Sequence, residues 1–197
     1  MPPPSTRDRI LGSARTLYEA GGVHALSLRK VASDVELTPM AIYRHFADKD
    51  ALVEALVLDA LARWAGRVAA VRIEDPVAWL EAVGEEFLVF ALEEPRRFEL
   101  AFLARSTRAR RIPDDFDEGR STAGQLWMAR LKELRARGRL APDVAPVDVG
   151  FTMWALAQGL VTLYRAGRFV GGAAEFRAFY SRSIRRCLAS FIIVEAH

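Results

Sequence analysis

Helix start and stop signals divide the sequence into a series of helical segments. They constrain the fold more than any other feature of the sequence. Thr38-Pro39, Asp75-Pro76 and Pro146 mark helix starts, because a threonine or aspartate side chain accepts an unpaired amide and a proline at the first position loses no hydrogen bond. Gly21-Gly22 and Gly171-Gly172 supply stops. No stretch keeps the alternating pattern of a strand. We predict an all-α fold of about nine helices.

The N-terminal part predicts three helices followed by a long one. The first, of about four turns, stops at Gly21-Gly22, the second follows Ser27 as its N-cap, and the third runs from Thr38 to about Phe46. Asp48 then caps a helix that runs to about Val71. The segment from Arg105 to Glu118 lacks an apolar period, so we predict a loop there.

Composition sets the class of protein. The chain has 197 residues with 28 Lys+Arg against 25 Asp+Glu, so bulk charge alone does not indicate nucleic-acid binding. The longest uncharged stretch, Val149 to Tyr164, is shorter than the ~20 apolar residues that span a bilayer. No secretory leader pattern is present, and the single Cys187 cannot form an intramolecular disulfide. We expect a cytoplasmic protein.

Two short helices joined by Val35-Glu36-Leu37-Thr38, after one longer helix, have the size and order of a helix-turn-helix unit. The stretch LSLRKVASDVELTPMAIYRHFADKDALVEAL, from Leu26 to Leu56, resembles the N-terminal module of TetR-type transcriptional regulators. Tyr43-Arg44-His45-Phe46 followed by Lys49 is its specific signature, and ILGSARTLYE resembles the family's first helix. The resemblance implies a helix-turn-helix DNA-binding domain over residues 1–50 and a helical effector-binding and dimerisation domain over residues 51–197.

The third helix has side chains suited to the major groove. Polar and methyl-bearing side chains contact base edges there, and flanking donors contact phosphates. The expected DNA-binding residues are Ser27, Arg29, Thr38, Pro39, Met40, Ala41, Tyr43, Arg44, His45 and Lys49. Tyr43, His45 and Lys49 are expected on phosphates, and the resemblance adds Ser27 and Arg29. This segment has no asparagine or glutamine, so Arg44 is the first candidate to bind guanine and Arg29 the second.

Glu36 departs from the family pattern. The family usually has glycine at this turn position, because the backbone there commonly takes a positive φ. Glutamate in that conformation costs about 1 kcal/mol or more. Its carboxylate lies near the predicted DNA face, where it either weakens affinity or points away.

Two helices are candidates for a dimer interface. The helix from about Val147 to Arg165 is apolar on nearly every side, so it needs cover on more than one face. The last helix has an apolar stripe of Phe176, Tyr180, Ile184, Cys187, Leu188 and Phe191. In the resembling family the last two helices form a four-helix bundle with a second chain. We therefore expect a homodimer that binds a palindromic operator of double-stranded DNA.

The larger domain is rich in aromatic residues, and the resemblance implies a small-molecule sensor there. The expected ligand-binding residues are Phe87, Phe90, Phe102, Trp127, Trp154 and Gln158, with an apolar or aromatic effector. Core packing is the alternative interpretation for each aromatic residue.

An enzyme would need sequence motifs that a DNA-binding regulator does not need. No phosphate-binding loop, nucleophile motif or metal-ligand cluster is present, so we expect no enzyme, metal or cofactor. A helical small-molecule-binding or adaptor protein with a vestigial helix-turn-helix is the remaining alternative. The favoured hypothesis is a TetR-like repressor that an effector releases from its operator.

Overall fold

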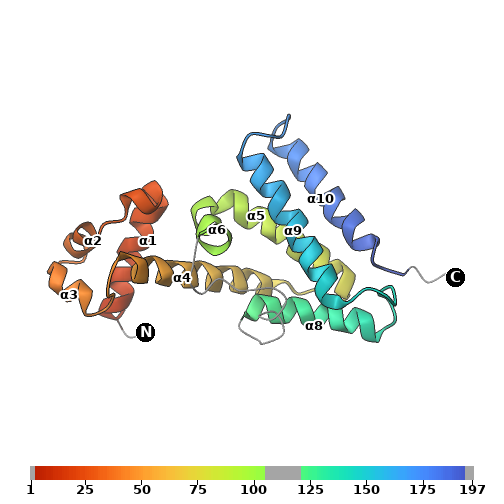
Figure 1. Ribbon diagram of the computed structural model, residues 1–197, viewed down its shortest axis with the longest axis horizontal. Coiled ribbons are helices and arrows are strands. Elements are labelled where there is room, and N and C mark those ends of the chain that lie inside the picture. The colour runs from red at the N-terminus through yellow and green to blue at the C-terminus, as the bar shows by residue number, and fades with distance from the viewer. Residues whose placement is uncertain (1–2, 105–120, 194–197) are drawn as a thin grey trace. The chain divides into compact units, whose positions relative to one another are not determined.

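The computed structural model describes residues 3–104 and 121–193, and within these ranges the chain is all-helical, as predicted. The nine helices of the described residues are α1 (Thr6–Ala25), α2 (Leu28–Asp34), α3 (Pro39–Tyr43), α4 (Lys49–Ala70), α5 (Pro76–Glu93), α6 (Pro95–Phe102), α8 (Thr122–Ala136), α9 (Pro146–Arg165) and α10 (Ala173–Ala189) (Figure 1). The predicted loop from Arg105 to Glu118 lies outside the described residues.

The helix starts follow the capping signals. The Thr38 hydroxyl accepts the Ala41 amide at 3.2 Å, and the Asp48 carboxylate accepts the Ala51 amide at 2.7 Å. At the start of α5 the Ala78 amide donates to Asp75 at 2.9 Å, and this bond lowers the pKa of the Asp75 carboxyl. These bonds satisfy amides that have no partner within the helix.

The chain divides into two compact units. The first holds the chain up to Arg63 and the segment that begins at Glu94, and the second holds Trp64–Glu93 and the C-terminal helices. Helix α4 therefore begins in the first unit and ends in the second. The predicted domain boundary at residue 50 stays a prediction.

In the first unit, α1, α2, α3 and the start of α4 surround one core. Its fully buried members include Ile10, Val31, Ile42 and Leu52, one from each helix. Helix α6 joins this core through Leu100. Helix α1 is interrupted near its end, where Gly21 and Gly22 leave helical geometry and Gly22 takes a φ of +66°.

In the second unit, α10 packs against α5 and α9, and α8 packs against α5 and α9. Helices α9 and α10 run antiparallel and lie side by side in Figure 1. The buried Tyr180 hydroxyl donates to the carbonyl oxygen of Gly84 at 2.9 Å, and burial raises its pKa. No helix in the described ranges is both long and apolar enough to cross a bilayer.

Helix α10 approaches α5 closely at Gly84. A Cβ added there would lie 2.9 Å from Cγ2 of Ile184, a buried branched side chain. Gly84→Ala is therefore expected to lower the free energy of unfolding by about 1 kcal/mol or more in urea titrations. Gly66→Ala, a matched helical control with open space around its Cβ, is expected to raise it by up to about 1 kcal/mol. An equal gain from both variants would contradict this contact.

Candidate nucleic-acid interface

Helix α3 is held to the first unit along one side only. It has five residues, starts with the Thr38 cap and Pro39, and places Ile42 fully in the core. The turn that follows continues to Phe46, whose amide donates to Ile42 at 3.0 Å. Phe46 is buried, and the Arg7 guanidinium lies 5.0 Å from its ring centroid. These anchors fix a helix too short to be stable alone.

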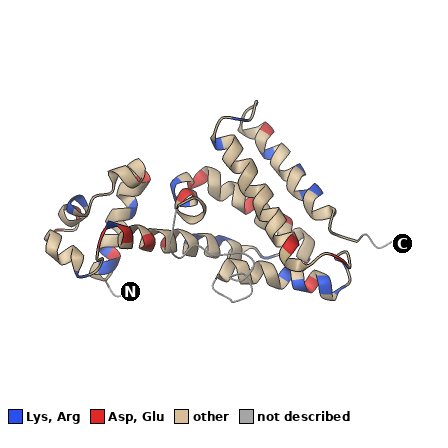
Figure 2. Ribbon diagram, in the orientation of Figure 1, with Lys and Arg blue, Asp and Glu red and all other residues tan. Residues whose placement is uncertain are grey.

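The other side of α3, together with its N-cap and the two residues that follow the helix, is open to solvent. We call it the α3 surface, which consists of Thr38, Pro39, Met40, Tyr43, Arg44 and His45. Met40 is 71% exposed and Tyr43 is 50% exposed, while Ala41 is half-buried. Figure 2 shows α3 without charge, whereas the start of α2 carries the exposed Arg29 and Lys30. An uncharged helix next to basic side chains matches base contacts flanked by phosphate contacts.

Ser27 occupies the N-cap position of α2, but its side chain makes no capping hydrogen bond, contrary to the capping role expected from the sequence. The backbone alone starts the helix there, with the Val31 amide donating to the Ser27 carbonyl at 2.9 Å. The exposed Ser27 hydroxyl is thus available to an external acceptor such as a phosphate.

Lys49 ties the start of α4 to the end of α1. Its Nζ donates to the carbonyl oxygen of Val23 at 2.8 Å, directly after the break at Gly22. An ammonium group has three N–H donors, so two remain for a phosphate. The structure thus gives Lys49 a second contact that the sequence did not predict.

The turn between α2 and α3 has the positive φ that the family resemblance implied. Glu36 has a φ of +56° and is the one non-glycine residue with a positive φ in the described ranges. The Leu37 amide donates to Ala32 at 2.9 Å and the Glu36 amide donates to Ser33 at 3.2 Å. This pair of bonds is the Schellman motif, which usually has glycine at the position of Glu36.

Helix α1 fixes this turn with two side chains. Arg9 Nη2 donates to the carbonyl oxygen of Val35 at 2.8 Å, and the Ser13 hydroxyl donates to Asp34 at 3.1 Å. The end of α2 and the start of α3 are thus held by a third helix. Neither contact could be predicted from the sequence, because a side chain on α1 gives no local signal of a partner more than 20 residues away.

The expected ligand-binding residues are distributed over α5, α6, α8 and α9. Phe87 and Phe90 are buried against Trp64, with ring centroids 5.6 and 5.8 Å from its ring, so they fill the core. Phe102 pairs with Phe98 in α6, in the first unit. Trp127, Trp154 and Gln158 are half-buried on α8 and α9.

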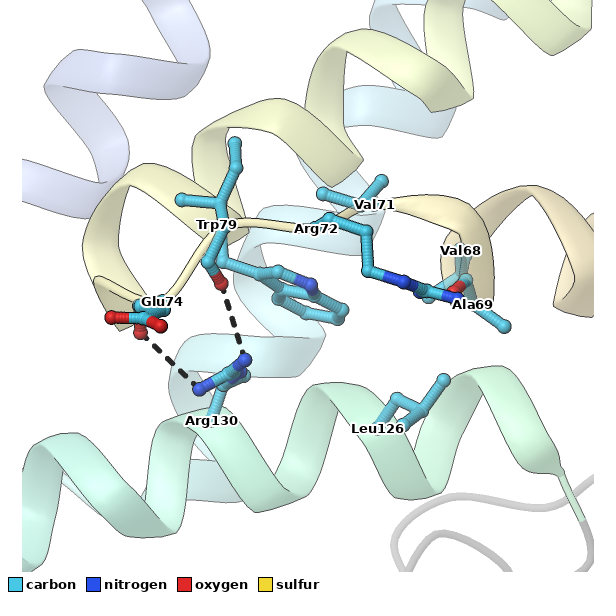
Figure 3. Close-up of a pocket in the computed structure, with 9 residues that line it drawn as sticks. Val68, Ala69, Val71, Arg72, Glu74, Trp79, Leu126 and Arg130 are labelled. Atoms are coloured by element: carbon cyan, nitrogen blue, oxygen red, sulfur yellow. Dashed lines mark hydrogen bonds between the residues drawn. The ribbon is translucent and has the colours of Figure 1, made fainter.

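A pocket of about 400 Å³ lies elsewhere in the second unit, where α4 leads into α5 opposite α8. Its lining residues are Val68, Ala69, Val71, Arg72, Ile73, Glu74, Trp79, Leu126 and Arg130 (Figure 3). Arg130 donates to the carbonyl oxygens of Ile73 and Glu74 at 3.2 and 3.3 Å and lies 5.7 Å from the Trp79 ring centroid. None of the six expected ligand-binding residues lines this pocket.

The apolar stripe of α10 is the core of the chain itself, which corrects the expectation from the sequence. Phe176, Tyr180, Ile184 and Leu188 are each at most 2% exposed within one protomer, so they are not available to a partner. Cys187 and Phe191 are half-buried, and burial raises the pKa of the Cys187 thiol. The large apolar side chains that are exposed on α9 and α10 are instead Phe151, Leu163 and Phe179.

Known families match both parts of the chain. Residues 10–56 match the bacterial regulatory proteins of the tetR family, and residues 80–187 match the tetracyclin repressor-like C-terminal domain. The chain belongs to the TetR family. As a member of this family it is a DNA-binding transcriptional regulator, and the matched residues 10–56 lie in the first unit.

Individual relatives agree with the family. The HTH-type transcriptional repressor AcnR of Corynebacterium efficiens is 25% identical over 194 residues, covering 93% of this chain and 95% of its own. The HTH-type transcriptional regulator UidR of Escherichia coli K12 is 24% identical over 144 residues, 71% of each chain.

Solved structures share the fold. A Rhodococcus sp. RHA1 protein of unknown function has a TM-score of 0.78 at 19% identity, with 97% of both chains covered. TetR from Acinetobacter baumannii AYE in complex with minocycline has a TM-score of 0.63 at 21% identity, with 92% of this chain and 93% of that chain covered.

The backbone strain at Glu36 gives a stability prediction. Glu36→Gly is expected to raise the free energy of unfolding by about 1 kcal/mol, because glycine adopts a positive φ without steric cost. Glu36→Ala is the control, since alanine keeps the Cβ and therefore the strain. Thermal unfolding of the three proteins measures the effect. If Glu36→Ala stabilises as much as Glu36→Gly, the strain is not the cause.

Proposed function

We propose that the protein is a homodimeric repressor that binds a palindromic operator through the α3 surface and leaves it when a small apolar or aromatic effector binds the second unit. The observation that carries this proposal is α3 itself. Ile42 anchors it in the core while its uncharged outer side, with Met40 and Tyr43, is exposed. Two copies related by a two-fold axis place two such helices in successive major grooves.

The side chains divide into base and phosphate contacts. Thr38, Pro39, Met40 and Ala41 lie at the start of α3, where their methyl and methylene groups suit the thymine methyl. Arg44 follows the helix and is exposed, which suits a bidentate contact with guanine. Ser27, Arg29, Tyr43, His45 and Lys49 supply phosphate contacts.

The proposed dimer contact is the exposed face of α9. From Phe151 to Leu163 the helix has no charged residue, and its exposed positions include Thr152, Ala155 and Gly159. Small residues three and four positions apart share one face of a helix and let a second helix approach closely. The exposed side of α10 is basic by contrast, so α9 supplies the apolar part of the interface, with Phe179 beside it.

The proposed effector site is the pocket beside Trp79. Val68, Val71 and Leu126 provide apolar walls, and the indole of Trp79 adds an aromatic surface. An effector dissociates DNA only if it binds more tightly to the conformation that has low DNA affinity. Because the pocket includes the end of α4, and α4 begins in the first unit, this helix is the proposed route of coupling.

Selection from a random duplex pool tests the function. The wild-type protein is expected to recover one palindrome that it binds about 10³-fold or more tightly than a scrambled duplex at near-physiological salt. Arg44→Ala is expected to lose the preference for guanine at one position in each half-site, which costs about 1–3 kcal/mol of discrimination.

Tyr43→Phe is the matched control, because it removes one phosphate-binding hydroxyl and no base contact. It is expected to weaken binding to all sequences alike. An unchanged consensus with Arg44→Ala would remove Arg44 from base recognition. Retention of DNA without any consensus would favour a vestigial helix-turn-helix.

Gly159 offers a test of the dimer. No atom of the described chain lies within 4 Å of a Cβ added at Gly159, so the protomer tolerates a side chain there. Gly159→Arg is expected to convert dimers to monomers in sedimentation velocity, because the added charge meets the partner helix. Gly66→Arg on α4 has similar open space and is expected to remain dimeric. Folded dimers of Gly159→Arg, verified by circular dichroism, would place the interface elsewhere.

A further inference from the structure

The backbone strain at Glu36 is not offset by any contact of its side chain. The residue is exposed at a φ of +56°, and within the described ranges its carboxylate makes no hydrogen bond or ion pair. Strained residues persist at functional sites, and an outlier of this kind is a reason to look for a role in function. Folding contacts therefore do not explain a glutamate at this position.

Within the described ranges no cationic side chain pairs with the Glu36 carboxylate. Arg9 is directed to the carbonyl oxygen of Val35 at 2.8 Å, not to the Glu36 carboxylate. Asp34, two residues earlier, accepts from the Ser13 hydroxyl and adds a second negative charge. The turn thus carries two exposed carboxylates, at Asp34 and Glu36, between the basic start of α2 and the uncharged α3.

Glu36 lies two residues before Thr38, the first of the proposed DNA contacts at the start of α3. The turn joins α2, which begins with Arg29 and Lys30, to α3. Helices α2 and α3 pack against each other, so the turn is rigidly connected to both. A carboxylate there is repelled by the DNA phosphates. At about 7 Å in water, one such pair weakens binding about threefold.

We propose that Glu36 is an electrostatic attenuator of DNA binding, which lowers the affinity for operator and non-operator duplexes alike. The proposal rests on the proposed function of the α3 surface. The repulsion acts on phosphates, which every duplex has, so it weakens binding without changing base preference. A weaker operator complex also dissociates at a lower effector occupancy. The effector lowers operator affinity by a fixed factor, and the affinity is already low at the start.

Glu36→Gln separates charge from strain. Glutamine has the same length and keeps the Cβ at a positive φ, but it is neutral. The variant is expected to bind operator and scrambled duplex about threefold more tightly at low salt, with an unchanged melting temperature. The gain is expected to shrink as salt rises, because exposed charges are screened over about 10 Å at 0.1 M. Fluorescence anisotropy across a KCl series measures both.

Asp143→Asn is the control for net charge, since Asp143 is exposed in the second unit. It is expected to leave DNA affinity unchanged. The proposal is overturned if Glu36→Gln binds as the wild type does at every salt concentration, or if Asp143→Asn gives the same gain. Failure of the proposed function looks different: the wild type, Glu36→Gln and Glu36→Gly would then all fail to distinguish the selected operator from its scramble.

Discussion

Burial of Ile42 is the interaction on which the DNA-binding unit depends. A helix of five residues has too few internal hydrogen bonds to form alone, so tertiary contacts must hold it. Ile42 and Phe46 enter a core to which α1, α2 and α4 also contribute. Because Ile42 and Phe46 are buried in this core, α3 cannot rotate about its axis, and its exposed face keeps one orientation in the first unit.

Local signals in the sequence predicted the helix starts well. A cap is a contact within four residues, so Thr38, Asp48 and Asp75 could be assigned without knowledge of the fold. The positive φ at Glu36 was expected from the family resemblance, because the family usually has glycine at this turn position. Ser27 shows the limit of such signals, since the position was predicted correctly but the side-chain bond was not formed.

Contacts between distant segments could not be predicted in this way. The stripe of α10 was correctly identified as apolar, but a stripe shows only that a face is buried and not what covers it. Gly84 explains the outcome, because its lack of a side chain lets Ile184 and Tyr180 approach α5. The pocket beside Trp79 also depends on contacts between distant segments, since Arg130 on α8 donates to the backbone carbonyls of Ile73 and Glu74.

The short length of α3 also has a consequence for dynamics. A helix whose start is capped by the Thr38 hydroxyl and whose fourth residue, Ile42, lies in the core cannot unwind and re-form by itself while its neighbours stay folded. Its few amide protons should therefore exchange with solvent only when the surrounding core opens. Loss of DNA recognition on heating is then expected to coincide with cooperative melting of the first unit, without a separate local transition.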